Sequence, residues 1–168
     1  MSKIYTKKGD KGETGTFHGR MAKFDALPEA IGSIDELNSL IGVCRISTSP
    51  LPLSTIVERE LVRIQNNLLT IGSQLAGSKK RLRPSEVTRL EKLIDKLTDE
   101  MPKLSNFIYP VGELQLARAV CRRAERRVVA LENTDKNILK YLNRLSDALF
   151  TMGRWVNWKM GMKEEVWK

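Results

Sequence analysis

The stretch Leu114-Gln-Leu-Ala-Arg-Ala-Val-Cys-Arg-Arg-Ala-Glu-Arg-Arg-Val-Val-Ala-Leu131 decides the fold of this chain. It contains neither Gly nor Pro and is rich in Ala, Leu, Arg and Glu, so we predict a helix here. At about 100° per residue, one stripe of this helix is small and apolar. That stripe consists of Ala117, Val120, Cys121, Ala124, Val128 and Leu131. It predicts that the helix packs inside a bundle.

A second stripe of the same helix holds three arginines four residues apart, Arg118, Arg122 and Arg126. Like charges at this spacing repel by roughly 0.2–0.5 kcal/mol per pair on an exposed helix. Within a bundle, such an arginine row needs anions beside it, either carboxylates of the protein or phosphates of a ligand. Arg123 and Arg127 point in another direction, and we expect them to be solvated.

Four further segments repeat apolar residues three and four positions apart, as helices in a bundle do. They are Glu29 to Ile46, Leu53 to Ala76, Ser85 to Met101 and Lys136 to Lys159. On the first of them, Asp35 and Asn38 share a face beside the apolar stripe. On the last, Asn143 and Asp147 do the same.

Residues that favour helix ends mark the boundaries of these segments. Pro28 lies just ahead of the first helix, and Thr48 to Pro52 predicts a turn after it. We predict that Ser85 is the N-cap of the third helix and that Asn133 to Asp135 caps the last one. Gly77 to Pro84 predicts a basic, solvated connection.

The first 28 residues are not helical in character. Thr6-Lys-Lys-Gly-Asp-Lys-Gly-Glu-Thr-Gly-Thr16 is dense in Gly, Lys and Thr, which suits either of two structures. Its glycines could let backbone amides converge on a phosphate, or the segment could be a flexible basic arm. Its spacing is not that of a P-loop.

Together these segments predict an all-α fold, an antiparallel five-helix bundle with an irregular glycine-rich N-terminal loop. We expect a single domain over residues 1–168, with residues 1–28 as the loop and 29–160 as the bundle. Trp155, Trp158 and Trp167 near the end of the chain could cover an oligomer contact or pack the end of the last helix.

Composition narrows the function classes. The formal net charge is +9, which favours an anionic partner such as nucleic acid, a nucleotide or an acidic surface. The single His18 excludes a multi-histidine metal site, and we expect Cys44 and Cys121 to be reduced core residues. No apolar run approaches the roughly 20 residues of a membrane span. We therefore expect a cytoplasmic protein without membrane partners.

Four separated blocks resemble the PduO-type corrinoid adenosyltransferases, also called ATP:cob(I)alamin adenosyltransferases. The blocks are Tyr5-Thr-Lys-Lys-Gly-Asp-Lys-Gly-Glu-Thr14, Glu29-Ala-Ile-Gly-Ser-Ile-Asp-Glu-Leu-Asn-Ser39, Leu116-Ala-Arg-Ala-Val-Cys-Arg-Arg-Ala-Glu-Arg126 and Tyr141-Leu-Asn-Arg-Leu-Ser-Asp147. They occur in the order of the family and span most of the chain.

The resemblance implies an enzyme that transfers the 5′-deoxyadenosyl group of ATP to the cobalt of a reduced corrinoid, forming adenosylcobalamin and triphosphate. It implies Mg²⁺ alongside ATP, and cob(I)alamin or a related corrinoid as the second substrate. It also implies a homotrimer with active sites between subunits, served by an electron-donating reductase, with no role for nucleic acid.

The resemblance assigns roles to particular residues of this sequence. The ATP-binding loop corresponds to Thr6, Lys7, Lys8, Gly9, Thr14 and Gly15, with Lys23 as a further nucleotide contact. The triphosphate side corresponds to Arg122, Arg123, Glu125, Arg126 and Asn143, with Glu125 near the metal. For catalysis, Arg122 neutralises the leaving triphosphate, and Asp35 and Arg118 form an ion pair between two subunits. Phe107 packs beneath the corrin and excludes the lower ligand of cobalt.

One block departs from the family pattern. Phe107-Ile-Tyr-Pro-Val-Gly-Glu-Leu-Gln-Leu116 is several residues shorter, and Val111-Gly112 replaces Gly-Gly. This departure leaves open a bundle of the same family that binds ATP but has lost corrinoid chemistry. The basic charge leaves open a helical nucleic-acid-binding protein.

Overall fold

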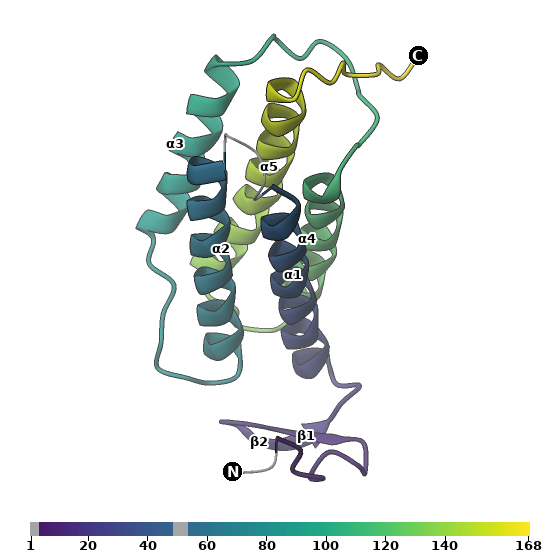
Figure 1. Ribbon diagram of the computed structural model, residues 1–168. Helices are drawn as coiled ribbons and strands as arrows, with labels where there is room; N and C mark the ends of the chain where they lie inside the picture. Colours follow the sequence, from purple (N-terminus) through teal and green to yellow (C-terminus); the bar gives the residue numbers. More distant parts are fainter. Residues whose placement is uncertain (1–3, 49–53) are drawn as a thin grey trace.

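The computed structural model describes residues 4–48 and 54–168 of the chain (Figure 1). Within these ranges it contains the five predicted helices, α1 (Ala26–Thr48), α2 (Ser54–Leu75), α3 (Ser85–Asp99), α4 (Glu113–Val129) and α5 (Lys136–Lys159). The all-α bundle is therefore confirmed. The turn predicted after α1 falls largely on residues 49–53, outside the described residues.

The helices pack around one shared core. α1 packs against both α2 and α4, α4 packs against α5, and α3 covers the other side of α5. Apolar side chains from every helix fill the interior, among them Leu37, Ile41, Leu68, Leu97 and Leu142. Burying one such side chain contributes about 1.5–3 kcal/mol, so these stripes are what hold the helices together.

The apolar stripe predicted for α4 forms its buried face. Ala117, Cys121, Ala124 and Val128 are completely buried, whereas Leu131 follows the end of the helix and is only partly buried. Two of these residues are alanines, which leave room for neighbouring helices on both sides. α4 therefore sits between α1 and α5.

Two predicted helix starts need correction. α1 begins at Ala26, so Pro28 lies within its first turn, where no helical partner is required for the missing N–H. Ser85 is the first residue of α3 and not its N-cap, a position held by Pro84 without a side-chain hydrogen bond. By contrast, Asp135 caps α5 as predicted, because its carboxylate accepts the N–H of Asn137 at 2.8 Å.

The N-terminal loop contains a β-hairpin that the sequence did not predict. β1 (Glu13–Thr16) pairs antiparallel with β2 (Gly19–Ala22) across the turn residues Phe17 and His18. Gly19 has a φ of 108°, a conformation that glycine adopts readily. The hairpin is attached to the end of α2, because the N–H of Phe17 donates to the carbonyl of Ala76 at 2.9 Å.

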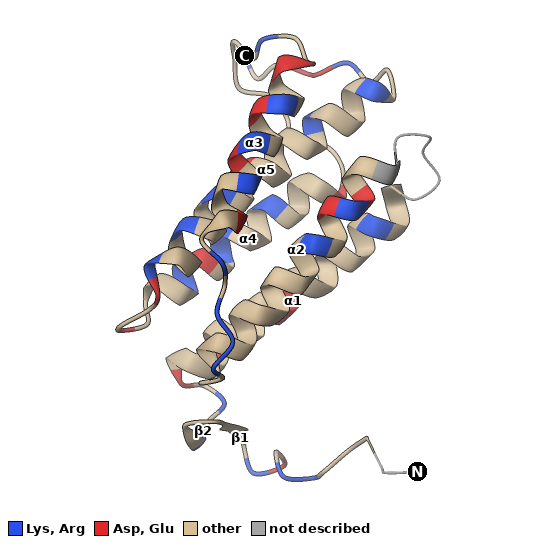
Figure 2. Ribbon diagram, turned by 90° about the vertical axis from the view of Figure 1, so that its left-hand side faces the viewer, with Lys and Arg blue, Asp and Glu red and all other residues tan. Residues whose placement is uncertain are grey.

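Charged side chains cover much of the outside of the bundle (Figure 2). Lysines and arginines are concentrated in the segment before β1 and in the connection from α2 to α3, where Lys79, Lys80, Arg81 and Arg83 are exposed as predicted. Between α2 and α3, the guanidinium of Arg63 lies 2.6 Å from the buried carboxylate of Glu86. Among the described residues, no helix is both long and apolar enough to cross a membrane.

Candidate functional site

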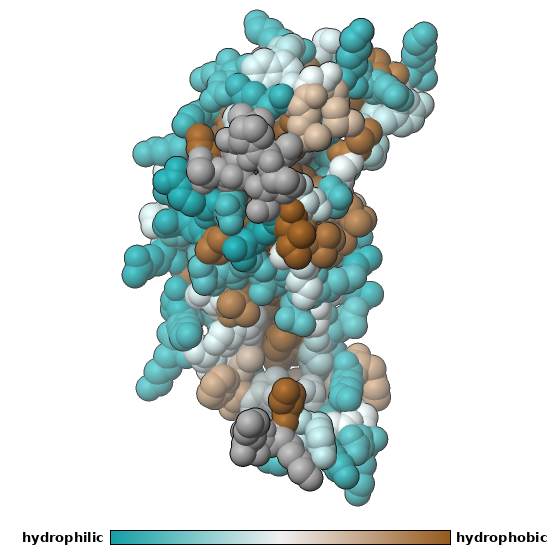
Figure 3. Space-filling model, viewed as in Figure 1, coloured by the Kyte–Doolittle hydropathy of each residue, from teal (hydrophilic) through white to brown (hydrophobic). Residues whose placement is uncertain are grey.

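A pocket of about 410 Å³ lies where the hairpin meets α1 and α2. Its lining includes Thr14 and Gly15 of β1 and Asp35 and Asn38 of α1. Figure 3 shows this side of the molecule, on which apolar side chains gather over α1 and α2 within a mainly hydrophilic surface. The fold thus joins the glycine-rich motif to the polar face of the first helix. We call this cavity the hairpin pocket.

Asn38 is a member of this pocket that the sequence did not single out as a site residue. Its Oδ1 atom is buried and has no hydrogen-bond partner among the described residues. A buried acceptor without a partner costs about 1–3 kcal/mol, so such groups are rare unless something else satisfies them. The only sequence signal was its position three residues after Asp35.

The residues before the hairpin form a compact basic turn. The N–H of Lys23 donates to the carbonyl of Gly12 at 2.9 Å, which brings the end of β2 back over the loop. A Cβ atom on Gly9 would lie 3.2 Å from the amino nitrogen of Lys23, so the end of the lysine side chain packs closely against this glycine. Lys7 and Lys8 are exposed beside them. The loop residues predicted to contact a nucleotide therefore lie together.

The arginine row (Arg118, Arg122 and Arg126) lies on the side of α4 next to α5. Arg118 is partly buried, with Nε donating to Gln115 at 3.0 Å and its guanidinium 6.0 Å from the ring centre of Phe150. Arg122 and Arg126 are exposed. In the part of the chain that the structure describes, none of the three forms an ion pair.

Beside the arginine row, Asn143 of α5 donates its side-chain N–H to the carboxylate of Glu125 at 3.1 Å. The residues predicted for the triphosphate side, Arg122, Glu125, Arg126 and Asn143, therefore share one surface formed by α4 and α5. Here Arg122 and Arg126, which have no ion-pair partner among the described residues, lie beside the carboxylate of Glu125, an arrangement suited to a polyanion that reaches it from outside.

Arg123 and Arg127 correct the sequence-based expectation. Instead of being only solvated, Arg123 pairs with Glu36 of α1 at 2.5 Å and Arg127 pairs with Glu29 of α1 at 3.3 Å. Both guanidinium groups remain about half exposed, so these are surface ion pairs along the contact of α1 with α4. The predicted nucleotide contact Arg123 thus already has a carboxylate partner in its own chain.

A buried side chain of the bundle positions the guanidinium of Arg118. Gln115, which accepts from Arg118, is buried and donates its amide to the carbonyl of Phe150 at 3.2 Å. A Cβ atom on Gly153 would lie 2.9 Å from the amide nitrogen of Gln115. The glycine therefore leaves the space in which Gln115 bridges α5 and the guanidinium of Arg118.

The hairpin pocket and the arginine row lie on different parts of one chain. The pocket is lined by the hairpin, α1 and α2, with no residue from α4 or α5. Asp35 at its edge is exposed and, within the described residues, has no ion-pair or hydrogen-bond partner. A single chain thus brings the predicted site residues together in two groups but does not join the groups.

Phe107 lies outside both groups, in the connection from α3 to α4. Its side chain is 79% exposed and its ring meets that of Trp167 edge to face, with centroids 6.4 Å apart. The other tryptophans behave differently: Trp155 is buried, with its indole N–H bonded to Glu100 at 3.0 Å, and Trp158 is partly exposed. Trp155 therefore packs the end of the bundle, whereas Trp167 covers one side of Phe107.

The described residues contain few groups that could bind a metal ion without a substrate. Among the described residues, no group of three His, Cys, Asp or Glu side chains is placed to hold one. Burial raises the pKa of the Cys44 thiol to about 11 and also raises that of Cys121, so both stay protonated core residues. Glu125 lies on α4 between Arg122 and Arg126, and Mg²⁺ commonly binds one or two carboxylates together with substrate phosphates.

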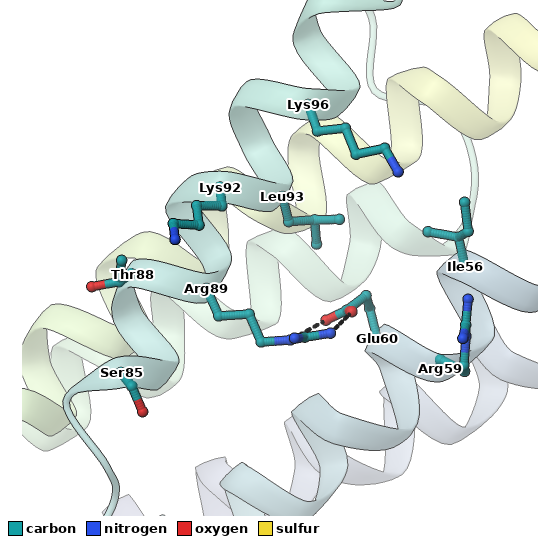
Figure 4. Close-up of a pocket in the computed structure, with 9 residues that line it drawn as sticks. All are labelled: Ile56, Arg59, Glu60, Ser85, Thr88, Arg89, Lys92, Leu93 and Lys96. Atoms are coloured by element: carbon teal, nitrogen blue, oxygen red, sulfur yellow. Dashed lines mark hydrogen bonds and ion pairs between the residues drawn. The ribbon is translucent and has the colours of Figure 1, made fainter.

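A larger hollow, of about 670 Å³, lies between α2 and α3 and contains none of the predicted site residues (Figure 4). Arg89 is bound to the buried carboxylate of Glu60 at its floor. Figure 4 shows Lys92 and Thr88 pointing away from this pair. Because the cationic groups do not converge on one point, this hollow is a charged groove between helices and not the best candidate site.

Fold and site together define a helical-bundle protein with a pocket of about 410 Å³ beneath a glycine-rich hairpin and, apart from that pocket, an exposed arginine row on α4. Comparison with known proteins agrees, since the profile of the family described as cobalamin adenosyltransferase matches residues 4–156. The chain belongs to the cobalamin adenosyltransferase family.

Individual relatives cover nearly the whole chain. The corrinoid adenosyltransferase of Bacillus subtilis is 44% identical over 172 residues, which span 95% of this chain and 89% of that protein. The corrinoid adenosyltransferase MMAB of Homo sapiens is 42% identical over 192 residues, which span 99% of this chain and 74% of that protein.

The structure is also similar to solved structures. One is a phenylalanine-to-alanine variant of the PduO-type ATP:corrinoid adenosyltransferase of Lactobacillus reuteri, complexed with cobalamin and ATP. It superposes with a TM-score of 0.92 and 32% identity, covering 99% of both chains. An arginine-to-lysine variant from the same organism, complexed with ATP, has a TM-score of 0.88 and 31% identity, covering 98% of this chain and all of that one.

Proposed function

We propose that this protein transfers the 5′-deoxyadenosyl group of ATP to the cobalt of a reduced corrinoid, releasing triphosphate. The observation that carries the proposal is the arginine row, whose guanidinium groups lack ion-pair partners within the described chain. Family membership and the ATP and cobalamin complexes of similar proteins support the same reaction. A corrinoid and a nucleotide are thus the two substrates.

The reaction makes limited chemical demands on the protein. Cob(I)alamin is itself a strong nucleophile, so the protein must hold C5′ of ATP in line with cobalt and stabilise the departing triphosphate. We assign stabilisation of the triphosphate to Arg122 and Arg126. Nucleotide binding falls to the loop residues Thr6, Lys7, Lys8, Gly9, Thr14 and Gly15, together with Lys23 and Asn143.

Mg²⁺ fits this site as a partner of the nucleotide and not as a metal held by the protein alone. Its protein ligand would be Glu125, which lies beside Arg122 and Arg126 on α4 and is held by Asn143. When bound, Mg²⁺ would neutralise part of the triphosphate charge. The remaining charge is left to the guanidinium groups of Arg122 and Arg126.

We further infer that the active site is completed by a second copy of the chain, in a homotrimer. Asp35 and Arg118 both lack an ion-pair partner within the described residues and lie in separate groups. An ion pair between Asp35 of one copy and Arg118 of the next would join the hairpin pocket to the arginine row. The exposed apolar side chains of Val43 and Ile46 on α1 support a covered surface.

Phe107 is proposed to pack beneath the corrin and exclude the lower ligand of cobalt. Its high exposure leaves its ring accessible to a second molecule. Removing that ligand would raise the reduction potential of cob(II)alamin and so make its reduction easier, as proteins commonly do with bound cofactors. A separate reductase would supply the electron. The buried free thiols Cys44 and Cys121 support a reducing compartment such as the cytoplasm.

The direct test is an absorbance assay with chemically reduced cob(I)alamin and Mg·ATP. We expect loss of the cob(I)alamin absorbance with formation of adenosylcobalamin, and no reaction when AMP replaces ATP. Formation of no adenosylcobalamin under these conditions would refute the proposed function. A calorimetric titration that still detected ATP binding would then identify a family member that has lost corrinoid chemistry.

A further inference from the structure

The segment after α5, residues 160–168, lies along the connection that carries Phe107 (Figure 1). We call this segment the tail. Ile108 and Val166 form an antiparallel bridge, in which the N–H of Trp167 donates to Phe107 at 2.9 Å and the N–H of Tyr109 donates to Glu165 at 3.0 Å. The tail therefore acts as a partner strand for the backbone on both sides of Ile108.

A further hydrogen bond holds the connection beyond this bridge. Asn157, near the end of α5, donates its side-chain amide to the carbonyl of Val111 at 3.1 Å. Every second residue of the connection, Phe107, Tyr109 and Val111, is therefore held by the tail or by α5. Alternate backbone groups face one side in an extended chain, so these three hydrogen bonds lie along one side of the connection. It fixes a connection that is short compared with the family pattern.

One ion pair, between the buried Arg154 and the exposed residue Glu164, attaches the tail to the bundle. Nε of Arg154 donates to one carboxylate oxygen of Glu164 at 2.6 Å, and a second guanidinium nitrogen donates to the other oxygen at 3.1 Å. The Arg154 side chain is only 6% exposed, and it also donates to the carbonyl of Pro102 at 3.3 Å. Arg154 thus ties α5 to both the tail and the start of the connection.

We propose that Arg154 and Glu164 are positioning residues for the corrinoid side of the active site. Their two-point ion pair holds residues 165–167 against residues 107–109, which they meet in an isolated β-bridge, and this contact fixes the backbone and one side of the ring of Phe107. The inference rests on the proposed function, because it assumes that Phe107 contacts the corrin. Neither residue contacts a substrate in this proposal, so both act through Phe107.

The test compares Glu164→Gln with Glu165→Gln in the full-length protein. Both variants remove one negative charge, but the Glu165 side chain is exposed and forms no ion pair among the described residues, so it is the matched control. Hydrogen exchange measured by NMR should speed up by about tenfold or more at the N–H groups of Tyr109 and Trp167 in Glu164→Gln alone. This readout requires no corrinoid.

The kinetic readout separates positioning from general stability. In Glu164→Gln we expect the KM for cob(II)alamin, assayed with a chemical reductant, to rise by about tenfold, with less than a twofold change in the KM for ATP. The absorption spectrum of bound cob(II)alamin should show more of the form that keeps its lower ligand. Glu164→Asp, which keeps the charge, should recover part of both effects.

A second variant covers the case in which Glu164→Gln does not fold. Trp167→Pro removes the N–H that donates to Phe107 from an exposed part of the tail, and Trp167→Phe keeps that N–H and an aromatic ring. Trp167→Pro should reproduce the exchange and KM effects, and Trp167→Phe should not. Unchanged exchange at Tyr109 in both Glu164→Gln and Trp167→Pro would overturn the proposed positioning role. Absence of adenosylation in the unmodified protein would instead overturn the proposed function.

Discussion

Two sets of exposed arginines on α4 lie one residue apart in the sequence and differ in their ion-pair partners. Arg123 and Arg127 reach carboxylates of α1 in their own chain. Arg122 and Arg126 are exposed and have no carboxylate partner in the described part of the chain. The first set belongs to the contact between two helices, and the second set has positive charge that nothing in the described chain neutralises.

The comparison indicates which arginines the fold requires and which a ligand requires. An ion pair between exposed side chains contributes about 0–1 kcal/mol, so Arg123 and Arg127 add little to stability and less to chemistry. Arginines that repel one another along a helix cost stability unless an anion arrives. We therefore expect function to follow the unpaired set, and the predictions below test that division.

The largest expected effect is on catalysis by the unpaired set. Arg122→Ala should lower kcat/KM for adenosylation by about 10²–10³-fold, because a donor to a developing anion is lost. Arg123→Ala, which removes the neighbouring guanidinium, is the matched control and should change kcat/KM by less than about threefold. The measurement is cob(I)alamin consumption with saturating Mg·ATP. If kcat/KM fell equally in both variants, the paired and unpaired arginines would not differ in function.

The next effect tests the proposed contact between copies of the chain. Asp35→Arg would place two cations together at the subunit contact, and we expect about a 10–100-fold loss of activity with weaker assembly in sedimentation. The double variant Asp35→Arg with Arg118→Asp should regain much of both. If the double variant is no better than the single ones, Asp35 and Arg118 are not partners.

A third prediction concerns a paired arginine away from the site. The hydrogen bond from Arg63 holds the pKa of Glu86 below its ordinary value, with help from Asn67. This pair stabilises the fold above the unfolded-state pKa of Glu, about 4.3, and its contribution is lost as pH falls through the lower folded value. Glu86→Gln should therefore cost about 1–2 kcal/mol at pH 7, allowing for the partial exposure of Arg63, and progressively less in acid.

Urea unfolding at pH 7, 5 and 3.5 checks this prediction, with Glu91→Gln as a control for a more exposed carboxylate. The gap between wild type and Glu86→Gln should narrow as pH falls. A gap that stays constant would mean that the pKa of Glu86 is the same in the folded and unfolded states, so that Arg63 does not lower it.

The smallest expected effect is on the stability contributed by the paired set. Arg123→Ala should lower the free energy of unfolding by about 0.2–1 kcal/mol, and added salt should reduce that difference. Arg122→Ala should leave stability unchanged or slightly increase it, since one repulsion is removed. Urea unfolding at low and high salt measures both. A larger loss in Arg122→Ala would assign that residue to the fold.

The sequence predicted some features well because their signals are local. α5 was placed at its observed bounds, since a regular apolar seam and a capping Asp135 define it without reference to other helices. The hairpin was missed because Glu13–Thr16 and Gly19–Ala22 carry no alternation of apolar and polar residues. The partners of Arg123 and Arg127 depend on how α1 and α4 align along their contact, which periodicity does not report.

The candidate site shows the same limit. The loop residues are close in sequence, and Arg122, Glu125 and Arg126 lie within five positions on one helix, so the sequence could group each set. Asn143, on another helix, was added to the arginine group only through the resemblance to the family. The unpartnered acceptor of Asn38 could not be predicted, since burial of one atom depends on the packing of α1 against α2. The tail was missed for a related reason: about sixty residues separate Phe107 from Trp167, and no local pattern links them.

Gly153 shows how an interior residue can influence the surface that we propose to meet a second copy of the chain. It has no contact with solvent or substrate in its own right, but its missing side chain gives Gln115 room to hold the guanidinium of Arg118. Gly153→Ala would add one methyl group, displace Gln115 and so change the orientation of the Arg118 guanidinium, without altering any charge. If a Gly153→Ala variant lost activity, the cause would then be a weakened contact between copies of the chain. The effect would pass from Gly153 through the side-chain amide of Gln115 to Arg118.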